Sequence, residues 1–140
     1  MPYTDALEKL ERLGVTNMLA GCYERNGQYC VFGHIAPSTR KFKYEDIDIG
    51  QAAAMSSDVM DELWALNMSI KDARWLQRVC DGFEPTHEER IFGTLGETSE
   101  RRCWRVLNWL RLQEDIRTGA LDIKAQERIK HWCMTLGADA

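Results

Sequence analysis

The sequence lacks any long hydrophobic run. No apolar stretch approaches the ~20 residues that a membrane-spanning helix needs. The N-terminus also lacks a basic segment followed by an apolar run, which is the pattern of a secretory signal. We therefore expect a cytoplasmic protein that does not act at a membrane.

Cysteine is present but lacks the spacing of a metal site or a disulfide framework. The five cysteines are Cys22, Cys30, Cys80, Cys103 and Cys133. No two of them form a C-x-x-C pair, and an odd number without regular spacing favours reduced thiols in a cytosol. Cys22, Cys30 and His34 are the nearest group, whereas a tetrahedral zinc site needs four converging ligands. We expect no metal and no cofactor.

Repeats, low-complexity tracts and linker-like segments are absent as well. The 140 residues, 44% hydrophobic and 29% charged, predict a single globular domain over 1–140. A chain of this length buries a core without disulfides or metal. The net charge of −4 argues against a general nucleic-acid-binding domain, because such domains tend to be basic.

The clearest local signal is a β-hairpin over about residues 18–35. Asn26-Gly27 lies between two apolar-rich arms and favours a two-residue type I′ turn, since both turn positions need φ > 0. The predicted cross-strand pairs are Arg25 with Gln28, Tyr23 with Cys30, Cys22 with Val31, and Gly21 with Phe32. The period of two then puts Cys30 and His34 on one face of the hairpin and Cys22 on the other.

Most of the remaining chain favours helices. The expected helices cover residues 4–14, 56–67, 69–79, 88–95, 98–113 and 122–137, with a loop at 36–39 and a short edge strand at 42–44. Apolar stripes place Trp64, Trp75 and Trp132 in the core. The predicted fold is α+β and predominantly helical, with one hairpin packed on about five to six helices.

Recognisable catalytic motifs are missing. His87-Glu88-Glu89-Arg90 lacks the second histidine of a zinc protease, and the segment 93–96 lacks the Gly-Lys-Ser/Thr ending of a phosphate loop. A nucleophilic cysteine needs a base within hydrogen-bond reach. Cys30 or Cys22 with His34, His87 or His131 therefore stays an alternative without a local signature.

Two segments each carry charges of a single sign, one of them negative and the other positive. Residues 44–70 contain six acidic residues and no Lys or Arg, and residues 101–113 contain four arginines and no Asp or Glu. On a helix over 99–113, a core stripe forms from Cys103, Val106, Leu107 and Leu110. Trp104 and Trp109 flank this stripe on opposite sides, and Arg101 and Arg105 lie opposite it.

This Arg/Trp helix is the candidate binding surface. Its partner-facing residues are Arg101, Trp104, Arg105, Trp109 and Arg111. Exposed Arg and Trp suit a protein-binding hot spot, and they also suit stacking on bases with phosphate contacts. In the opposing interpretation the tryptophans are buried, and the arginines pair with Asp58, Asp61 or Glu62 inside the molecule.

The hairpin string Asn-Gly-Gln-Tyr-Cys-Val-Phe-Gly, with Gly27, Cys30 and Gly33, resembles a motif of small uncharacterised bacterial and phage domains. Those domains carry Asp/Asn-Gly-x-x-Cys-x-x-Gly and a later Asn-Asp turn; here Asp81 matches the turn and Cys80 replaces its Asn. The resemblance covers about residues 7–112. It implies an accessory protein of a bacterium or its virus, such as an anti-CRISPR-like inhibitor of host defence, and brings no catalytic activity with it.

The sequence therefore favours a non-enzymatic protein that acts by binding another protein. Nucleic-acid or nucleotide recognition through the Arg/Trp helix is the first alternative, and a cysteine-dependent enzyme is the second. A homodimer is compatible with each of these hypotheses.

Overall fold

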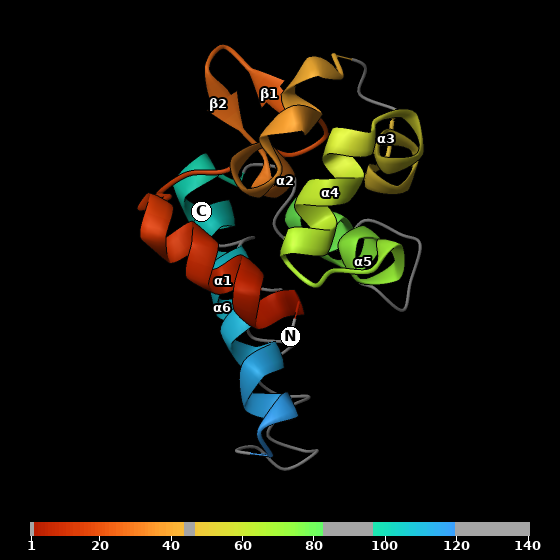
Figure 1. The fold of residues 1–140 in the computed structure, drawn as a ribbon. Helices are drawn as coiled ribbons and strands as arrows, with labels where there is room; N and C mark the ends of the chain where they lie inside the picture. The colour runs from red at the N-terminus through yellow and green to blue at the C-terminus, as the bar shows by residue number, and fades with distance from the viewer. Residues whose placement is uncertain (1, 44–46, 83–96, 120–140) are drawn as a thin grey trace.

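The computed structural model describes residues 2–43, 47–82 and 97–119 (Figure 1). Its elements are α1 (Pro2–Leu13), β1 (Glu24–Arg25), β2 (Gln28–Tyr29), α2 (Val31–Ile35), the 3₁₀ helix η1 (Pro37–Lys41), α3 (Ile49–Met55), α4 (Ser57–Ala65), α5 (Ile70–Asp81) and α6 (Ser99–Arg117). The fold is predominantly helical α+β, as predicted, and its described part contains a single two-stranded antiparallel sheet. No helix in these residues is long and apolar enough to cross a membrane.

Two groups of helices meet around α2. α1 packs along α6 on one side of the molecule, while α3, α4 and α5 pack together on the other (Figure 1). α2 contacts α1, α5 and η1, and its Phe32 and Ile35 are fully buried. Buried apolar residues from α1 through α6 belong to one core cluster.

Local capping sets most helix starts where the sequence predicts them. The hydroxyls of Ser56, Ser69 and Thr98 accept hydrogen bonds from the backbone N–H three residues on, which begins α4, α5 and α6. α3 was not predicted, although Asp48 and Gln51 form a complete capping box at its start.

The hairpin is shorter than its sequence suggests. The Arg25 with Gln28 pair is confirmed, and both turn residues have positive φ, +53° at Asn26 and +78° at Gly27. The sheet ends at Tyr29, because Cys30 is the N-cap of α2, which begins at Val31 where the prediction has a strand. The pairs of Cys22 with Val31 and of Gly21 with Phe32 are therefore wrong, as are the two hairpin faces drawn from them. Beyond the sheet, Cys30 N donates to Tyr23 O at 3.2 Å and Leu19 N donates to Tyr29 O at 2.9 Å.

The Gly-x-x-Cys-x-x-Gly string has a structural explanation in this chain. Gly27 supplies the positive φ of the turn, and Cys30 caps α2 by accepting a 3.4 Å hydrogen bond at Sγ from Gly33 N. A Cβ on Gly33 would lie against the Tyr23 carbonyl oxygen and 2.8 Å from Tyr29 Cβ. The three residues thus make a turn, a cap and a close helix–hairpin contact.

Other expectations need correction. Residues 37–39 of the expected loop belong to η1, and Ala36 is its N-cap. Phe42 and Lys43 do not form a strand, and Tyr44 lies outside the described residues. α1 begins at Pro2 instead of after Thr4. Trp64 is 68% exposed instead of in the core, and Trp75 is half-buried and does not belong to the core cluster. The helices expected at 88–95 and 122–137, with Trp132, also lie outside the described residues.

Candidate functional site

The Arg/Trp helix, observed as α6, does not present its five candidate residues on one exposed face. Arg105 is fully buried and Trp109 is only 3% exposed. Arg101, Trp104 and Arg111 are exposed. The exposed placement predicted for Arg105 is wrong, because α1 covers one side of α6 and α5 packs against another (Figure 1).

Arg105 joins α6 to the end of α5. Its Nε and Nη2 donate to the Glu97 carboxylate at 2.8 and 3.0 Å, and Nη1 and Nη2 donate to the carbonyl oxygens of Val79 and Cys80 at 2.5 and 3.2 Å. These carbonyls belong to the last turn of α5, where a cation also compensates the helix dipole. Arg102 Nε lies 3.2 Å from Glu97 as an ion pair without hydrogen-bond geometry. Arg105 therefore has a structural role, and its partner is Glu97 instead of the acidic segment.

Trp109 and Arg111 are also engaged within the fold. The Trp109 ring packs edge-on against Tyr3 of α1, with ring centroids 5.0 Å apart. Arg111 lies 3.4 Å from Glu11 on α1 in an exposed ion pair. Trp109 and Arg111 therefore contribute to α1–α6 packing, and Arg105 to the contact between α5 and α6. The interpretation with internal pairing is correct for the burial of Trp109 alone of the two tryptophans, and the partners of Arg105 and Arg111 are Glu97 and Glu11 instead of Asp58, Asp61 or Glu62.

The cysteine hypothesis meets an unfavourable environment. Burial raises the pKa of Cys30 well above its ordinary value, the pKa of Cys80 to about 12 and the pKa of Cys103 to about 11. The thiols of Cys80 and Cys103 donate to the backbone carbonyls of Leu19 and Val15. Because the thiolate is the reacting species, these buried cysteines are poor nucleophiles at neutral pH.

The histidines predicted as bases for Cys30 or Cys22 do not support a nucleophilic cysteine. Nε2 of His34 lies 3.0 Å from the Asn17 carbonyl oxygen, and Cys22 is half-buried. His87 and His131 lie outside the described residues. Within the residues that the structure describes, no group of three or more His, Cys, Asp or Glu side chains is arranged to hold a metal ion.

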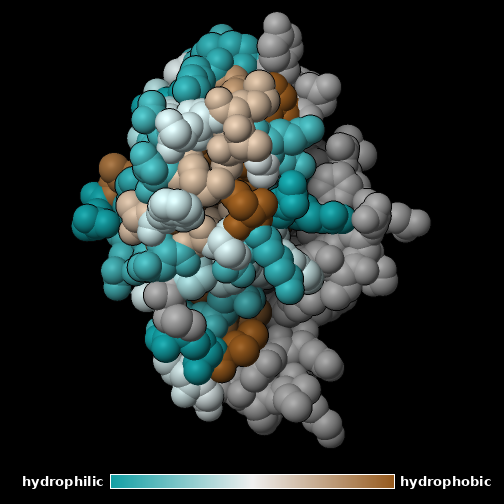
Figure 2. Space-filling model, turned by 45° about the vertical axis from the view of Figure 1, so that its right-hand side comes forward, coloured by the Kyte–Doolittle hydropathy of each residue, from teal (hydrophilic) through white to brown (hydrophobic). Residues whose placement is uncertain are grey.

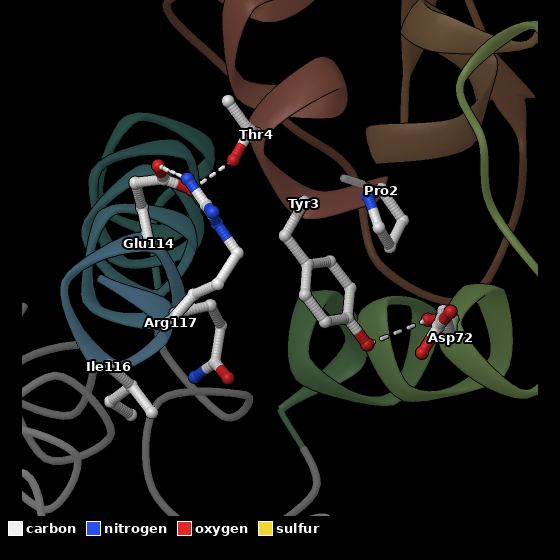
Figure 3. Close-up of a pocket in the computed structure, with 8 residues that line it drawn as sticks. Pro2, Tyr3, Thr4, Asp72, Glu114, Ile116 and Arg117 are labelled. Carbon is white, nitrogen blue, oxygen red and sulfur yellow. Dashed lines mark hydrogen bonds and ion pairs between the residues drawn. The ribbon is translucent and has the colours of Figure 1, made fainter. Parts of the chain in front are cut away.

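A pocket of about 400 Å³ opens between the start of α1 and the end of α6 (Figure 3). The Glu114 carboxylate accepts hydrogen bonds from Arg117 and Thr4, which lower its pKa to about 2. The Tyr3 hydroxyl donates to the Asp72 carbonyl oxygen at 3.1 Å, and burial raises the Tyr3 pKa. Glu114 is therefore ionised and Tyr3 protonated at neutral pH, so neither is suited to proton transfer.

The strongest exposed feature is the surface of α3 and α4 that faces solvent. We define the α3–α4 surface as Met55, Asp58, Asp61, Trp64 and Ala65. Trp64 is 68% exposed and Met55 66% exposed, more than any other large hydrophobic side chain in the described residues. The two aspartates and Ala65 are exposed as well. Figure 2, which brings the α3–α5 side of the molecule forward, shows tan to brown apolar surface bordered by teal polar groups.

Charges of both signs lie around α3 and α4, and Arg74 Nε is 3.9 Å from Asp48 at the start of α3. Asp5 accepts a hydrogen bond of 2.9 Å from Asn67 at the end of α4. Glu62 turns toward η1, where it accepts from Ser38 N at 3.0 Å. One cation reaches the start of α4, since Lys41 Nζ donates to Ser56 Oγ at 2.8 Å.

The sequence contains a signal for the α3–α4 surface, although the apolar stripe of α4 predicts that Trp64 is buried. Trp64 follows Asp61 by three residues and Asp58 by six, so it continues the acidic side of α4. Val59 and Leu63, on the other side, are fully buried. Comparisons with protein-family models, with curated proteins and with solved structures found no match.

Proposed function

We propose that this protein is a non-enzymatic binding protein whose partner is another protein, and that the partner docks on the α3–α4 surface. The observation that carries the proposal is the exposure of two large hydrophobic side chains, Trp64 and Met55, on well-formed helices. Tryptophan is strongly enriched among residues that dominate binding energy, because it buries a large area and brings a polar N–H.

The charges on the helix that carries Trp64 indicate the charge of the partner surface. α4, which carries Trp64, contains Asp58, Asp61 and Glu62 and no Lys or Arg. Asp58 and Asp61 are exposed beside the apolar side chains, which makes an acidic rim. The complementary surface is an apolar recess bordered by Lys or Arg. Such complementarity increases the association rate and excludes acidic partners.

The alternatives have less support. Thiol chemistry is opposed by the raised pKa of Cys30. Nucleic-acid binding through α6 has less support because Arg105 is buried and cannot contact a phosphate, and because Arg111 already pairs with Glu11. Inhibition of host defence by a phage protein, which the hairpin resemblance implies, works through protein binding and belongs within this proposal.

The test compares two exposed tryptophans on different helices. Tagged wild-type protein, Trp64→Ala and the matched control Trp104→Ala are used to capture proteins from a lysate of the native host, and the captured partner is then purified for calorimetry. We expect Trp64→Ala to weaken binding by about 2 kcal/mol or more, as hot-spot tryptophans do, and Trp104→Ala to leave it unchanged. The reverse result would place the site on α6 and contradict the proposal.

A measurement of nucleic-acid binding at increasing salt concentration distinguishes the nucleic-acid alternative from the proposed protein binding. Fluorescent single-stranded DNA and RNA are the probes, and we expect no binding at physiological salt. Affinity that falls steeply with salt and disappears in Arg101→Glu would instead support phosphate contacts by α6.

A further inference from the structure

A second pocket, of about 350 Å³, lies between α1, the loop 14–17, α2 and η1. It contains none of the residues of the α3–α4 surface. Its polar side chains include Lys9, His34 and Arg40, and its apolar side chains include Leu13 and Val15. No Asp or Glu is among the described residues that line it.

Lys9 and Arg40 are each held by a backbone carbonyl. Lys9 Nζ donates to Ile35 O at 2.8 Å, and Arg40 Nε donates to Gly33 O at 2.7 Å. The guanidinium of Arg40 also lies 3.8 Å from the centre of the Tyr29 ring. These contacts orient Lys9 and Arg40, and leave further N–H groups on both side chains for a ligand.

The two cations are not neutralised by a close carboxylate in the described part of the chain. Neither Lys9 nor Arg40 has an ion pair within 4.0 Å there, in contrast to Arg105 and Arg111. Glu24 is within electrostatic reach of Arg40, but its carboxylate is held by Lys43 at 2.7 Å and by Gly27 N at 3.2 Å. The charge of Arg40 also reaches His34, whose pKa it helps to lower after the larger effect of burial.

We propose that this pocket binds the phosphate group of a small phosphomonoester. Arg40 supplies a planar fork of donors and Lys9 a point charge, which together match the charge of about −1.5 to −2 on a phosphomonoester at pH 7. The volume falls in the range of small-molecule sites. Leu13, 54% exposed at the pocket, provides an apolar contact for the organic part. This is a small-ligand site beyond the protein-binding function proposed above.

The test is calorimetric titration of the full chain in a phosphate-free buffer. The probes are adenosine 5′-monophosphate, ribose 5-phosphate and inorganic phosphate, with adenosine as the phosphate-free control. We expect both esters to bind and adenosine not to bind. We expect inorganic phosphate to bind at least about tenfold more weakly than the esters, because it cannot contact Leu13.

The variant Lys9→Gln/Arg40→Gln should weaken ester binding by about a hundredfold, since each charge-assisted hydrogen bond contributes roughly tenfold. The matched control Lys71→Gln/Arg101→Gln removes the same charge at two exposed positions outside the pocket and should bind as wild type. If the pocket variant does not fold, the His34 ring resonances of the wild type provide the readout, because a bound phosphate should shift them.

Several results would overturn the proposal. The first is that adenosine binds as tightly as adenosine 5′-monophosphate, and the second is that the control variant weakens ester binding as much as the pocket variant does. The third is that neither ester binds at millimolar concentration, and the fourth is that the His34 ring resonances do not shift when an ester is added. Inorganic phosphate that binds as tightly as the esters would show a site for the free ion and overturn the assignment to a monoester.

Discussion

Arg105 and Glu97 form a buried ion pair in which both side chains are fully inaccessible to solvent. Two hydrogen bonds, at 2.8 and 3.0 Å, join the guanidinium to the carboxylate, and two more reach the final turn of α5. Removing Arg105 leaves the buried Glu97 carboxylate with Arg102 alone, whose Nε lies 3.2 Å away without hydrogen-bond geometry. A buried charge that loses most of its compensation is the costly case for internal ions.

Arg105→Met should therefore destabilise the protein strongly. The methionine keeps much of the side-chain volume, but Glu97 loses its two hydrogen bonds and the α5 carbonyls lose their donors. We expect the free energy of unfolding to fall by about 3–5 kcal/mol in urea denaturation. The control Arg101→Glu changes an exposed residue of the same helix and should stay within about 0.5 kcal/mol of wild type. Equal denaturation midpoints for Arg105→Met and wild type would contradict a structural role for the pair.

Gly33 and Gly50 offer a matched pair of helical glycine substitutions. In Gly33→Ala the new Cβ meets the Tyr23 backbone and lies 2.8 Å from Tyr29 Cβ, so the helix and hairpin must separate. We expect a loss of about 3 kcal/mol. In Gly50→Ala the three atoms nearest the new Cβ all belong to the Arg74 side chain, which is 54% exposed and can move away.

The second substitution should therefore change stability by less than about 1 kcal/mol, because alanine also favours the helix. Thermal melts of both variants check the prediction. If Gly33→Ala melts at the wild-type temperature, Gly33 is not needed for the close contact with the hairpin.

His34 should make stability depend on mildly acidic pH. Burial lowers its pKa in the folded state below the ordinary 6.5, and the positive charge of Arg40 lowers it further. The folded state thus binds fewer protons than the unfolded state between the lowered value and 6.5. Stability is complete above pH 6.5 and falls as pH decreases through this interval.

The variant His34→Gln can keep a side-chain donor for the Asn17 carbonyl but cannot titrate. Its free energy of unfolding should therefore vary less than that of wild type just below pH 6.5, as measured in phosphate-free buffers. Parallel pH profiles for the two proteins would show that His34 carries no such linkage.

Cysteine labelling provides a direct check on the enzyme alternative. Cys30 and Cys80 are buried, and burial raises the pKa of both thiols. We expect iodoacetamide at pH 8 to modify the half-buried Cys22 before Cys30, and Cys30 only at the rate of global unfolding. Mass spectrometry of digested samples follows each site. Rapid labelling of Cys30 in the native protein would revive nucleophilic chemistry.

The sequence by itself determined the features that depend on a few neighbouring residues. The turn at Asn26-Gly27 and the starts of α4, α5 and α6 at Ser56, Ser69 and Thr98 follow from local backbone geometry and from side chains that bond three residues away. The hydrophobic pattern also predicted a predominantly helical α+β fold.

The tertiary structure alone decided which of two similar residues is buried. Arg105 is internal because α5 ends beside it and Glu97 turns toward it, whereas Arg101, one helical turn away, is exposed. The sequence pattern likewise could not place Trp109 against Tyr3 and leave Trp64 in solvent. Capping acts within one helical turn, but burial depends on which distant segments meet, and a single helix does not encode that by itself.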